Sequence, residues 1–119
     1  MIAIIGLPNS GKTTYSKNFE NVVHFDYYLG RYEEGFKFLK TLEDAVIEGL
    51  FTSKQRRVEL IESCSHMETK KCIWLDVPLD ACMRRPGRPA GVVLREARIF
   101  EPPTLDEGWD EIEVIEYVE

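Results

Sequence analysis

A short stretch near the start of the chain constrains its fold more than any other feature. Residues 6–13 read Gly-Leu-Pro-Asn-Ser-Gly-Lys-Thr and match the pattern G-x-x-x-x-G-K-[ST], which is typical of loops that bind phosphate groups. The apolar run at residues 1–5 is typical of a parallel strand buried on both faces, and residues 13–19 can form a helix. Strand, loop and helix in this order is the context that the motif requires, so we predict an α/β fold with a nucleotide site at residues 6–13, the phosphate loop.

The residue types in the phosphate loop suit a triphosphate such as ATP. Gly6 and Gly11 let the backbone curve around an oxyanion with no Cβ in the way. The loop amides and the N-terminal end of the following helix attract negative charge. Lys12 is expected to reach the β- and γ-phosphates, and the Thr13 hydroxyl to ligate Mg²⁺. The residues predicted to contact the nucleotide here are Gly6, Pro8, Asn9, Ser10, Gly11, Lys12, Thr13 and Thr14.

Asn9 stands where many loops of this type have a further glycine. Asparagine tolerates left-handed backbone conformations better than most residues, so the loop can keep its curvature. The alternative interpretation is a glycine turn that binds nothing. The strand before the motif and the helix after it favour nucleotide binding over this alternative.

The composition is typical of one soluble globular domain. The chain has 119 residues, of which 44% are hydrophobic and 30% charged, so residues 1–119 are expected to form a single domain. No apolar run approaches the ~20 residues of a membrane span, and no signal peptide is indicated. The three cysteines lack C-x-x-C spacing and are expected to be reduced thiols, so a cytoplasmic location is predicted.

Charge is unevenly distributed along the chain. The net charge is −6, which argues against non-specific binding to polyanions. Five arginines nevertheless occur within residues 84–98, where Glu96 is the one acid, whereas eight acids and no lysine or arginine follow Arg98. The arginine cluster can either bind phosphates or form a solvated helix face, and composition alone does not choose between the two.

Apolar runs alternate with amphipathic stretches along the whole chain. This pattern predicts a three-layer α/β sandwich with a five-stranded, mostly parallel sheet. Residues 84–91 contain two prolines and two glycines and are expected to form a short, mobile loop, the arginine loop. The last segment alternates polar and apolar residues, which predicts an edge strand with one solvent-exposed face. Strands are expected at residues 1–5, 22–25, 45–50, 70–77 and 111–118, and helices at 13–19, 34–44, 55–63, 79–83 and 92–100.

Two acidic residues lie at or near the ends of predicted strands. Ligands of open α/β sheets bind beyond the carboxyl ends of strands, so Asp26, at the end of the second strand, is expected to face the phosphates. Glu48, at the end of the third, is either a residue that helps to hold Mg²⁺ or a surface glutamate, and both interpretations remain open. Phe36 and Phe38 fit a core stripe better than a substrate site, and His66 is expected to face solvent. On the helix expected at residues 55–63, Arg57 is expected to point outward.

Taken together, these features resemble the kinase domain of polynucleotide 5′-hydroxyl kinases of the phage type. The resemblance extends over nearly the whole chain. Besides the phosphate loop it includes Asp76-Val77-Pro78 at a strand end and, most tellingly, the segment Pro-Thr-Leu-Asp-Glu-Gly-Trp at residues 103–109. It implies the strand order 2-3-1-4-5 and transfer of the ATP γ-phosphate to the 5′-hydroxyl of a polynucleotide.

The same resemblance implies roles for individual residues. Asp26 would accept the proton of the attacking hydroxyl, while Arg84 and Arg88 would act as lid arginines that contact the nucleotide phosphates. The adenine site would lie at residues 102–105 and include Pro103. With Lys12 in its phosphate-binding role, these side chains form the predicted catalytic set.

Three other functions remain open at this level. A nucleoside or nucleoside-monophosphate kinase would recognise a base through aromatic residues at positions 27, 28, 36 and 38. A kinase acting on a hydroxymethylated base in DNA would use the same catalytic residues. A nucleotide-dependent switch would use the phosphate loop alone, without Asp26 or the arginine loop, and the joint presence of these features favours the kinases.

Overall fold

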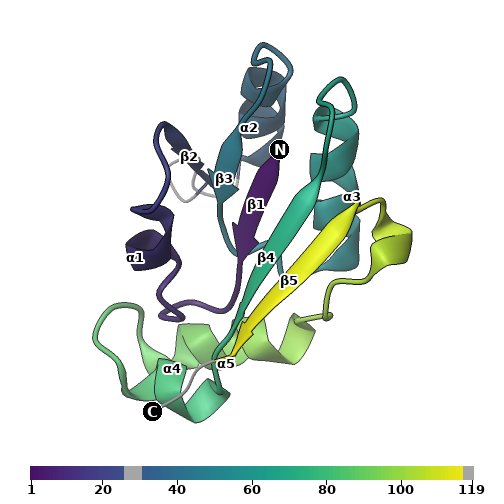
Figure 1. Cartoon of the computed structure of the whole chain (residues 1–119). Coiled ribbons are helices and arrows are strands. Elements are labelled where there is room, and N and C mark those ends of the chain that lie inside the picture. Colours follow the sequence, from purple (N-terminus) through teal and green to yellow (C-terminus); the bar gives the residue numbers. More distant parts are fainter. Residues whose placement is uncertain (26–30, 117–119) are drawn as a thin grey trace.

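The computed structural model describes residues 1–25 and 31–116 and contains one five-stranded sheet (Figure 1). Its strand order is β2-β3-β1-β4-β5, and all the paired strands run parallel. The predicted order is therefore confirmed, and the sheet is parallel throughout rather than mostly parallel. The strands are β1 (Ile2–Ile5), β2 (Val22–His24), β3 (Val46–Glu48), β4 (Lys71–Asp76) and β5 (Glu111–Glu116).

Helices connect successive strands, and two of them end earlier than the sequence predicts. The first ends at Ser16 rather than residue 19, and the second ends at Leu39 rather than residue 44. After both ends the backbone forms tight turns with hydrogen bonds over three residues, as in Phe19 N–H to Ser16 O and Leu42 N–H to Leu39 O. The helices are α1 (Lys12–Ser16), α2 (Tyr32–Leu39), α3 (Lys54–Ser63), α4 (Leu79–Arg84) and α5 (Ala90–Ile99), with a 3₁₀ turn η2 (Leu105–Glu107).

None of these helices, within the described part of the chain, is long and apolar enough to cross a membrane.

The sheet has a hydrophobic cluster on each face. On one face α2 and α3 supply Phe36, Leu39 and Leu60, which pack against β1, β3 and β4. On the other face Tyr15 and Phe19 pack against Ile4 and other strand residues. The predicted three layers are therefore present. Of the two phenylalanines assigned to a core stripe, Phe36 is buried, whereas Phe38 is 45% exposed.

The last strand lies at the sheet edge as predicted, but its apolar side chains are divided between the two faces of the sheet. Ile112 packs into the cluster beneath α2 and α3, whereas Ile115 packs into the cluster on the opposite face. Val114, which shares a face with Ile112, is 45% exposed. The reason is local: Val114 and Ile115 are adjacent, so the alternation breaks there, and successive side chains of a strand point to opposite faces.

A buried ion pair connects α3 with η2. Arg57, expected to point outward, has no exposed side-chain surface and donates two hydrogen bonds to Glu107, Nε to Oε1 at 2.7 Å and Nη2 to Oε2 at 3.0 Å. Its Nη1 donates to the Phe51 carbonyl at 2.8 Å, and the Trp109 indole donates to Glu107 at 3.0 Å. The segment at residues 103–109, which carried the resemblance, thus has a structural role here: it supplies the carboxylate that neutralises Arg57.

Cys64, Cys72 and Cys82 are buried and form no disulfide. Burial raises the pKa of the Cys64 thiol to about 11 and that of Cys72 to about 12. Both thiols are therefore protonated and unreactive at neutral pH, as expected for reduced cysteines in a hydrophobic core.

Candidate active site

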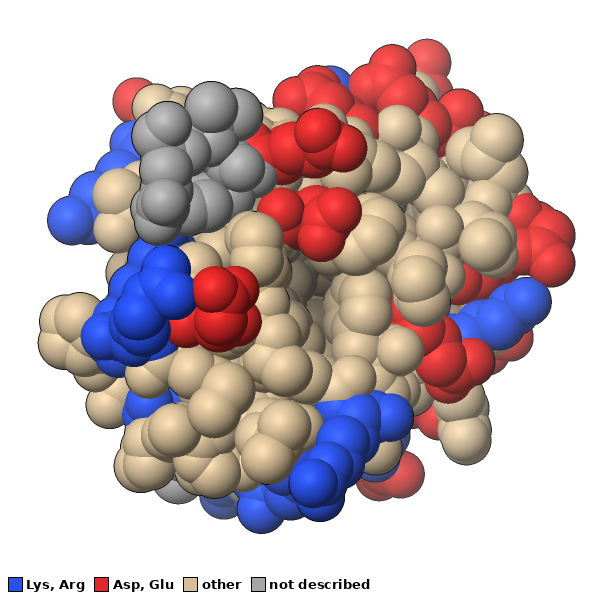
Figure 2. Space-filling model, turned by 90° about the horizontal axis from the view of Figure 1, so that it is seen from below, with Lys and Arg blue, Asp and Glu red and all other residues tan. Residues whose placement is uncertain are grey.

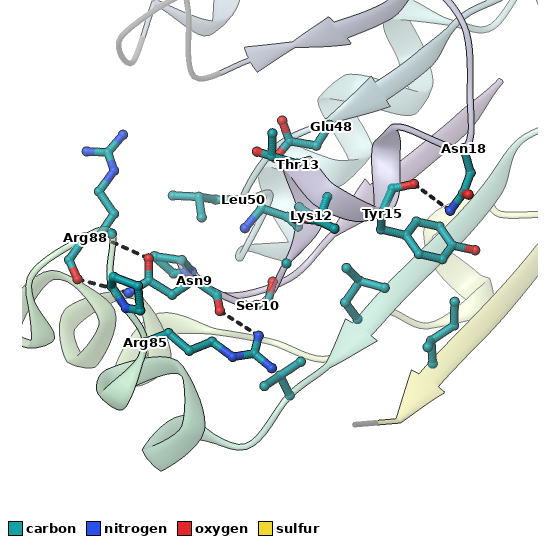
Figure 3. Close-up of a pocket in the computed structure, with 18 of the residues that line it drawn as sticks. Asn9, Ser10, Lys12, Thr13, Tyr15, Asn18, Glu48, Leu50, Arg85 and Arg88 are labelled. Atoms are coloured by element: carbon teal, nitrogen blue, oxygen red, sulfur yellow. Dashed lines mark hydrogen bonds between the residues drawn. The ribbon is translucent and has the colours of Figure 1, made fainter. Parts of the chain in front are cut away.

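A pocket of 1270 Å³ opens at the carboxyl ends of the strands. Figure 2, which looks onto this end of the molecule, shows a hollow with acidic and basic side chains on its rim. The phosphate loop, α1, the ends of β3, β4 and β5, and the arginine loop all contribute to the lining (Figure 3). This is the position where open α/β sheets bind ligands.

The phosphate loop has the conformation that an anion site requires. Asn9 and Gly11 both have left-handed backbones, with φ of 66° and 97°. A Cβ on Gly6 would lie 2.7 Å from the Ser10 Oγ and 3.0 Å from the Leu75 carbonyl, so only glycine fits there. Within the described residues, the buried Ser10 Oγ has no hydrogen-bond partner. A buried hydroxyl without a partner is costly, and a phosphate oxygen would satisfy it.

Lys12 lies deep in the pocket. Its side chain is only 6% exposed, and Nζ donates a hydrogen bond to the Leu7 carbonyl at 2.7 Å. The ammonium group is thereby held over the phosphate loop, where a nucleotide phosphate would meet it. The contact of Lys12 with the β- and γ-phosphates stays a prediction.

Thr13 and Glu48 lie on the same side of the pocket (Figure 3). Glu48 is 1% exposed, so the interpretation as a surface glutamate is wrong. Its Oε2 lies 2.7 Å from Nδ1 of His24, which orients the carboxylate from the neighbouring strand. Among the described residues no group of three or more acidic, histidine or cysteine side chains could hold a metal. Mg²⁺ needs only one or two protein ligands besides phosphates and water, so one hydroxyl and one carboxylate fit it.

The arginine loop contributes Arg85 and Arg88 to the lining, but not Arg84. Arg84 is exposed and pairs with Asp80 at 2.9 Å, one turn earlier in α4. Arg85 follows the helix in an extended conformation and donates Nη1 to the Asn9 carbonyl at 3.0 Å. Because Arg84 is the last residue of α4, its side chain stays on the helix surface beside Asp80. Arg85, and not Arg84, therefore lines the pocket together with Arg88.

The segment predicted to bind adenine, residues 102–105, does not line the pocket. Pro103 does not line the pocket, because it precedes η2 and β5, whereas the lining residues of β5 are Ile115 and Glu116 at the far end. The six residues of β5 separate the two ends by roughly 20 Å. An apolar wall of Leu75, Val77 and Ile115 lies within the pocket instead.

Asp26, the predicted catalytic base, lies outside the described residues, as do Tyr27 and Tyr28. The role of Asp26 therefore stays a prediction. The preceding residues are described: Phe25 is buried, and His24 ends β2 directly beside Glu48 of β3.

Sequence reasoning missed His24 and Arg85. A signal for His24 was present, because it lies near the carboxyl end of the strand predicted at residues 22–25, where ligands of open α/β sheets bind. No local signal separates Arg84 from Arg85. Which of two adjacent arginines faces the pocket depends on the residue where α4 ends.

Comparison with solved structures supports the fold assignment. A sugar kinase from Janibacter sp. HTCC2649, in its unliganded structure, is similar with a TM-score of 0.69 at 16% identity, over 97% of this chain and 83% of that one. A gluconokinase from Sinorhizobium meliloti 1021 has a TM-score of 0.68 at 13% identity, over 99% of this chain and 82% of that one. The chain has a P-loop kinase fold. Its sequence matches no protein-family model and no curated protein. At such low identity the likeness shows the fold alone.

Proposed function

We propose that this protein is an ATP-dependent phosphotransferase that acts on a hydroxyl acceptor. The observation that carries the proposal is the convergence of three kinds of group on one pocket: the phosphate loop with Lys12, the Thr13–Glu48 pair, and Arg85 with Arg88. Phosphoryl transfer depends on positioning and on neutralising negative charge, and these groups supply both. A switch that only binds nucleotide needs no arginines facing the phosphates.

Each group has a distinct part in this proposal. Bound Mg²⁺–ATP would supply the phosphoryl group and a cation that offsets its charge. Lys12 and the loop amides bind the phosphates, and Ser10 supplies a further hydroxyl. Thr13 and Glu48 hold the metal, with His24 orienting Glu48. Arg85 and Arg88 neutralise charge on the outer phosphates, and Asp26 takes the proton of the acceptor.

The nucleotide base is assigned to the apolar wall formed by Leu75, Val77 and Ile115. These side chains lie at the carboxyl ends of β4 and β5 and line the same pocket as the phosphate loop. Tyr15 lines the pocket near them and packs in the same cluster as Leu75 and Ile115. Such a wall binds the flat face of a base through apolar contact.

The acceptor of first choice is the 5′-hydroxyl of a polynucleotide, on the strength of the sequence resemblance. A second acceptor class is a small sugar or sugar acid, and the names of the two similar structures, a sugar kinase and a gluconokinase, favour it. The rim of the hollow carries acidic as well as basic side chains, so charge does not separate the two classes (Figure 2).

The deciding experiment is transfer of label from γ-labelled ATP to a panel of acceptors. The panel contains 5′-hydroxyl DNA and RNA oligomers, hydroxymethylated DNA, nucleosides, nucleoside monophosphates, gluconate and simple sugars. Labelled oligomer ends would support the polynucleotide kinase, and labelled sugars the second candidate. Asp26→Asn is expected to abolish transfer to the true acceptor. Binding of ATP with no acceptor labelled would favour the switch and contradict the proposal.

Two adjacent arginines provide an internal test of the arginine loop. Arg85→Ala is expected to lower kcat roughly hundredfold, because it removes a charge that faces the phosphates. Arg84→Ala is expected to change kcat less than about threefold, because Arg84 forms an exposed pair with Asp80 outside the pocket. Steady-state kinetics of both variants measure the change in kcat. A larger loss of kcat in Arg84→Ala than in Arg85→Ala would contradict the role proposed for Arg85.

Glu48→Gln tests the metal site with almost no change in side-chain volume. The Mg²⁺ concentration for half-maximal rate is expected to rise roughly 10–100-fold, since a carboxylate that supports the metal is lost. Titration of activity with Mg²⁺ at saturating ATP measures the shift. Glu43→Gln, on the exposed segment after α2, is the matched control. An unchanged Mg²⁺ requirement in Glu48→Gln would exclude Glu48 from the site.

A further inference from the structure

The side chain of Asn9 connects the phosphate loop to the arginine loop. Its Nδ2 donates to the Arg88 carbonyl at 3.0 Å, and its Oδ1 accepts from the Arg88 backbone N–H at 2.9 Å (Figure 3). Nδ2 also donates to the Cys82 carbonyl at 3.1 Å. These partners are two acceptors and one donor, so only one orientation of the amide satisfies them. All three bonds join residues more than seventy positions apart.

Two neighbouring features also bring the phosphate loop and the arginine loop close together. The Asn9 carbonyl accepts a hydrogen bond from Arg85 Nη1, so backbone and side chain of Asn9 both contact the arginine loop. Gly87 lies against the Asn9 amide with φ of +131°, and a Cβ there would come within 2.5 Å of Oδ1. The close approach of the two loops therefore requires asparagine at one position and glycine at the other.

We propose that Asn9 is a positioning residue that holds the arginine loop against the phosphate loop before nucleotide binds. Arg85 and Arg88 then form a fixed wall of the pocket instead of a lid that closes after binding. Pro86 and Pro89 restrict the backbone of the same loop, so a few hydrogen bonds are enough to hold it. A wall that is already in place lowers the entropic cost of binding the phosphates. This consequence rests on the proposed function, whereas the contact between the two loops rests on the hydrogen bonds of Asn9 alone.

The first test uses the protein without nucleotide. Asn9→Gly keeps a residue that readily adopts the φ of 66° but removes all three side-chain hydrogen bonds. Hydrogen exchange at the Arg88 amide is expected to become at least roughly tenfold faster, while amides of β1 are unchanged. Asn21→Gly is the matched control, since Asn21 is exposed, has φ of 55° and lies outside the pocket. Gly87→Ala, which forces the loops apart from the other side, is expected to reproduce the effect.

The second test asks whether the held loop positions the arginines for nucleotide. In Asn9→Gly the KM for ATP is expected to rise roughly tenfold, with a smaller change in kcat, because binding must then order the loop. Unchanged Arg88 exchange in both variants would overturn the proposal. Faster exchange with an unchanged KM would overturn the positioning role. If the wild-type protein binds no ATP, the proposed function fails, and the exchange measurement still decides whether Asn9 holds the loop.

Discussion

Lys12→Ala is expected to lower kcat for phosphoryl transfer by two to three orders of magnitude, about 3–4 kcal/mol of transition-state stabilisation. The buried ammonium group of Lys12 lies over the phosphate loop, and no other lysine lines the pocket within the described chain. Its charge acts in a site with little water, where screening is weak. Initial rates with the acceptor identified from the panel measure the effect.

The control for this variant lies one turn further along the chain. Lys17 is exposed, follows α1 directly and does not line the pocket. Lys17→Ala is therefore expected to retain wild-type kcat within about a factor of two, as is usual for exposed sites. Full activity in Lys12→Ala, with the fold intact by circular dichroism, would refute the proposed catalytic role of the phosphate loop.

Glu107→Gln is expected to destabilise the protein by about 3–5 kcal/mol and to lower Tm by roughly 10–20 °C. The substitution keeps the shape of the side chain but leaves the fully buried Arg57 guanidinium without a counter-charge. Asp106→Asn, an equally conservative change at the neighbouring exposed acid, is expected to have little effect. Denaturant unfolding of the wild type and both variants measures the free energies of unfolding. Equal stability of the two variants would contradict the stabilising role of the Arg57–Glu107 pair.

The same ion pair predicts how stability depends on pH. Burial alone would raise the pKa of Glu107, but the hydrogen bonds from Arg57 and Trp109 and the Arg57 charge outweigh burial and lower it below the ordinary 4.5. The stabilisation is therefore complete above about pH 4.5 and is lost as pH falls toward the folded-state pKa, because the unfolded chain takes up the proton first. The unfolding free energy of the wild type should fall with acid more steeply than that of Glu107→Gln, by up to ~1.4 kcal/mol per pH unit.

Local sequence determined the conformation of the phosphate loop. The motif at residues 6–13 prescribes its own backbone, because Gly6 and Gly11 occupy positions where other residues clash or are strained. The apolar runs around it determined the α/β class, and the resemblance supplied a strand order that the structure confirms. The loop conformation and the α/β class depend on neighbours in the chain, so a single sequence is enough to predict them, whereas the strand order was predicted from the resemblance.

The orientation of charged side chains was decided by the tertiary structure alone. Arg57 was predicted to point outward, because burying a charge is unfavourable unless a partner compensates it, and its partner Glu107 lies fifty positions away. The same holds for Arg85, whose partner is the Asn9 carbonyl, and for His24, whose partner is Glu48. Such contacts arise only when segments that are distant in the chain pack against one another. The sequence by itself therefore determined the conformation of the phosphate loop, and the packing decided which distant side chains contact one another.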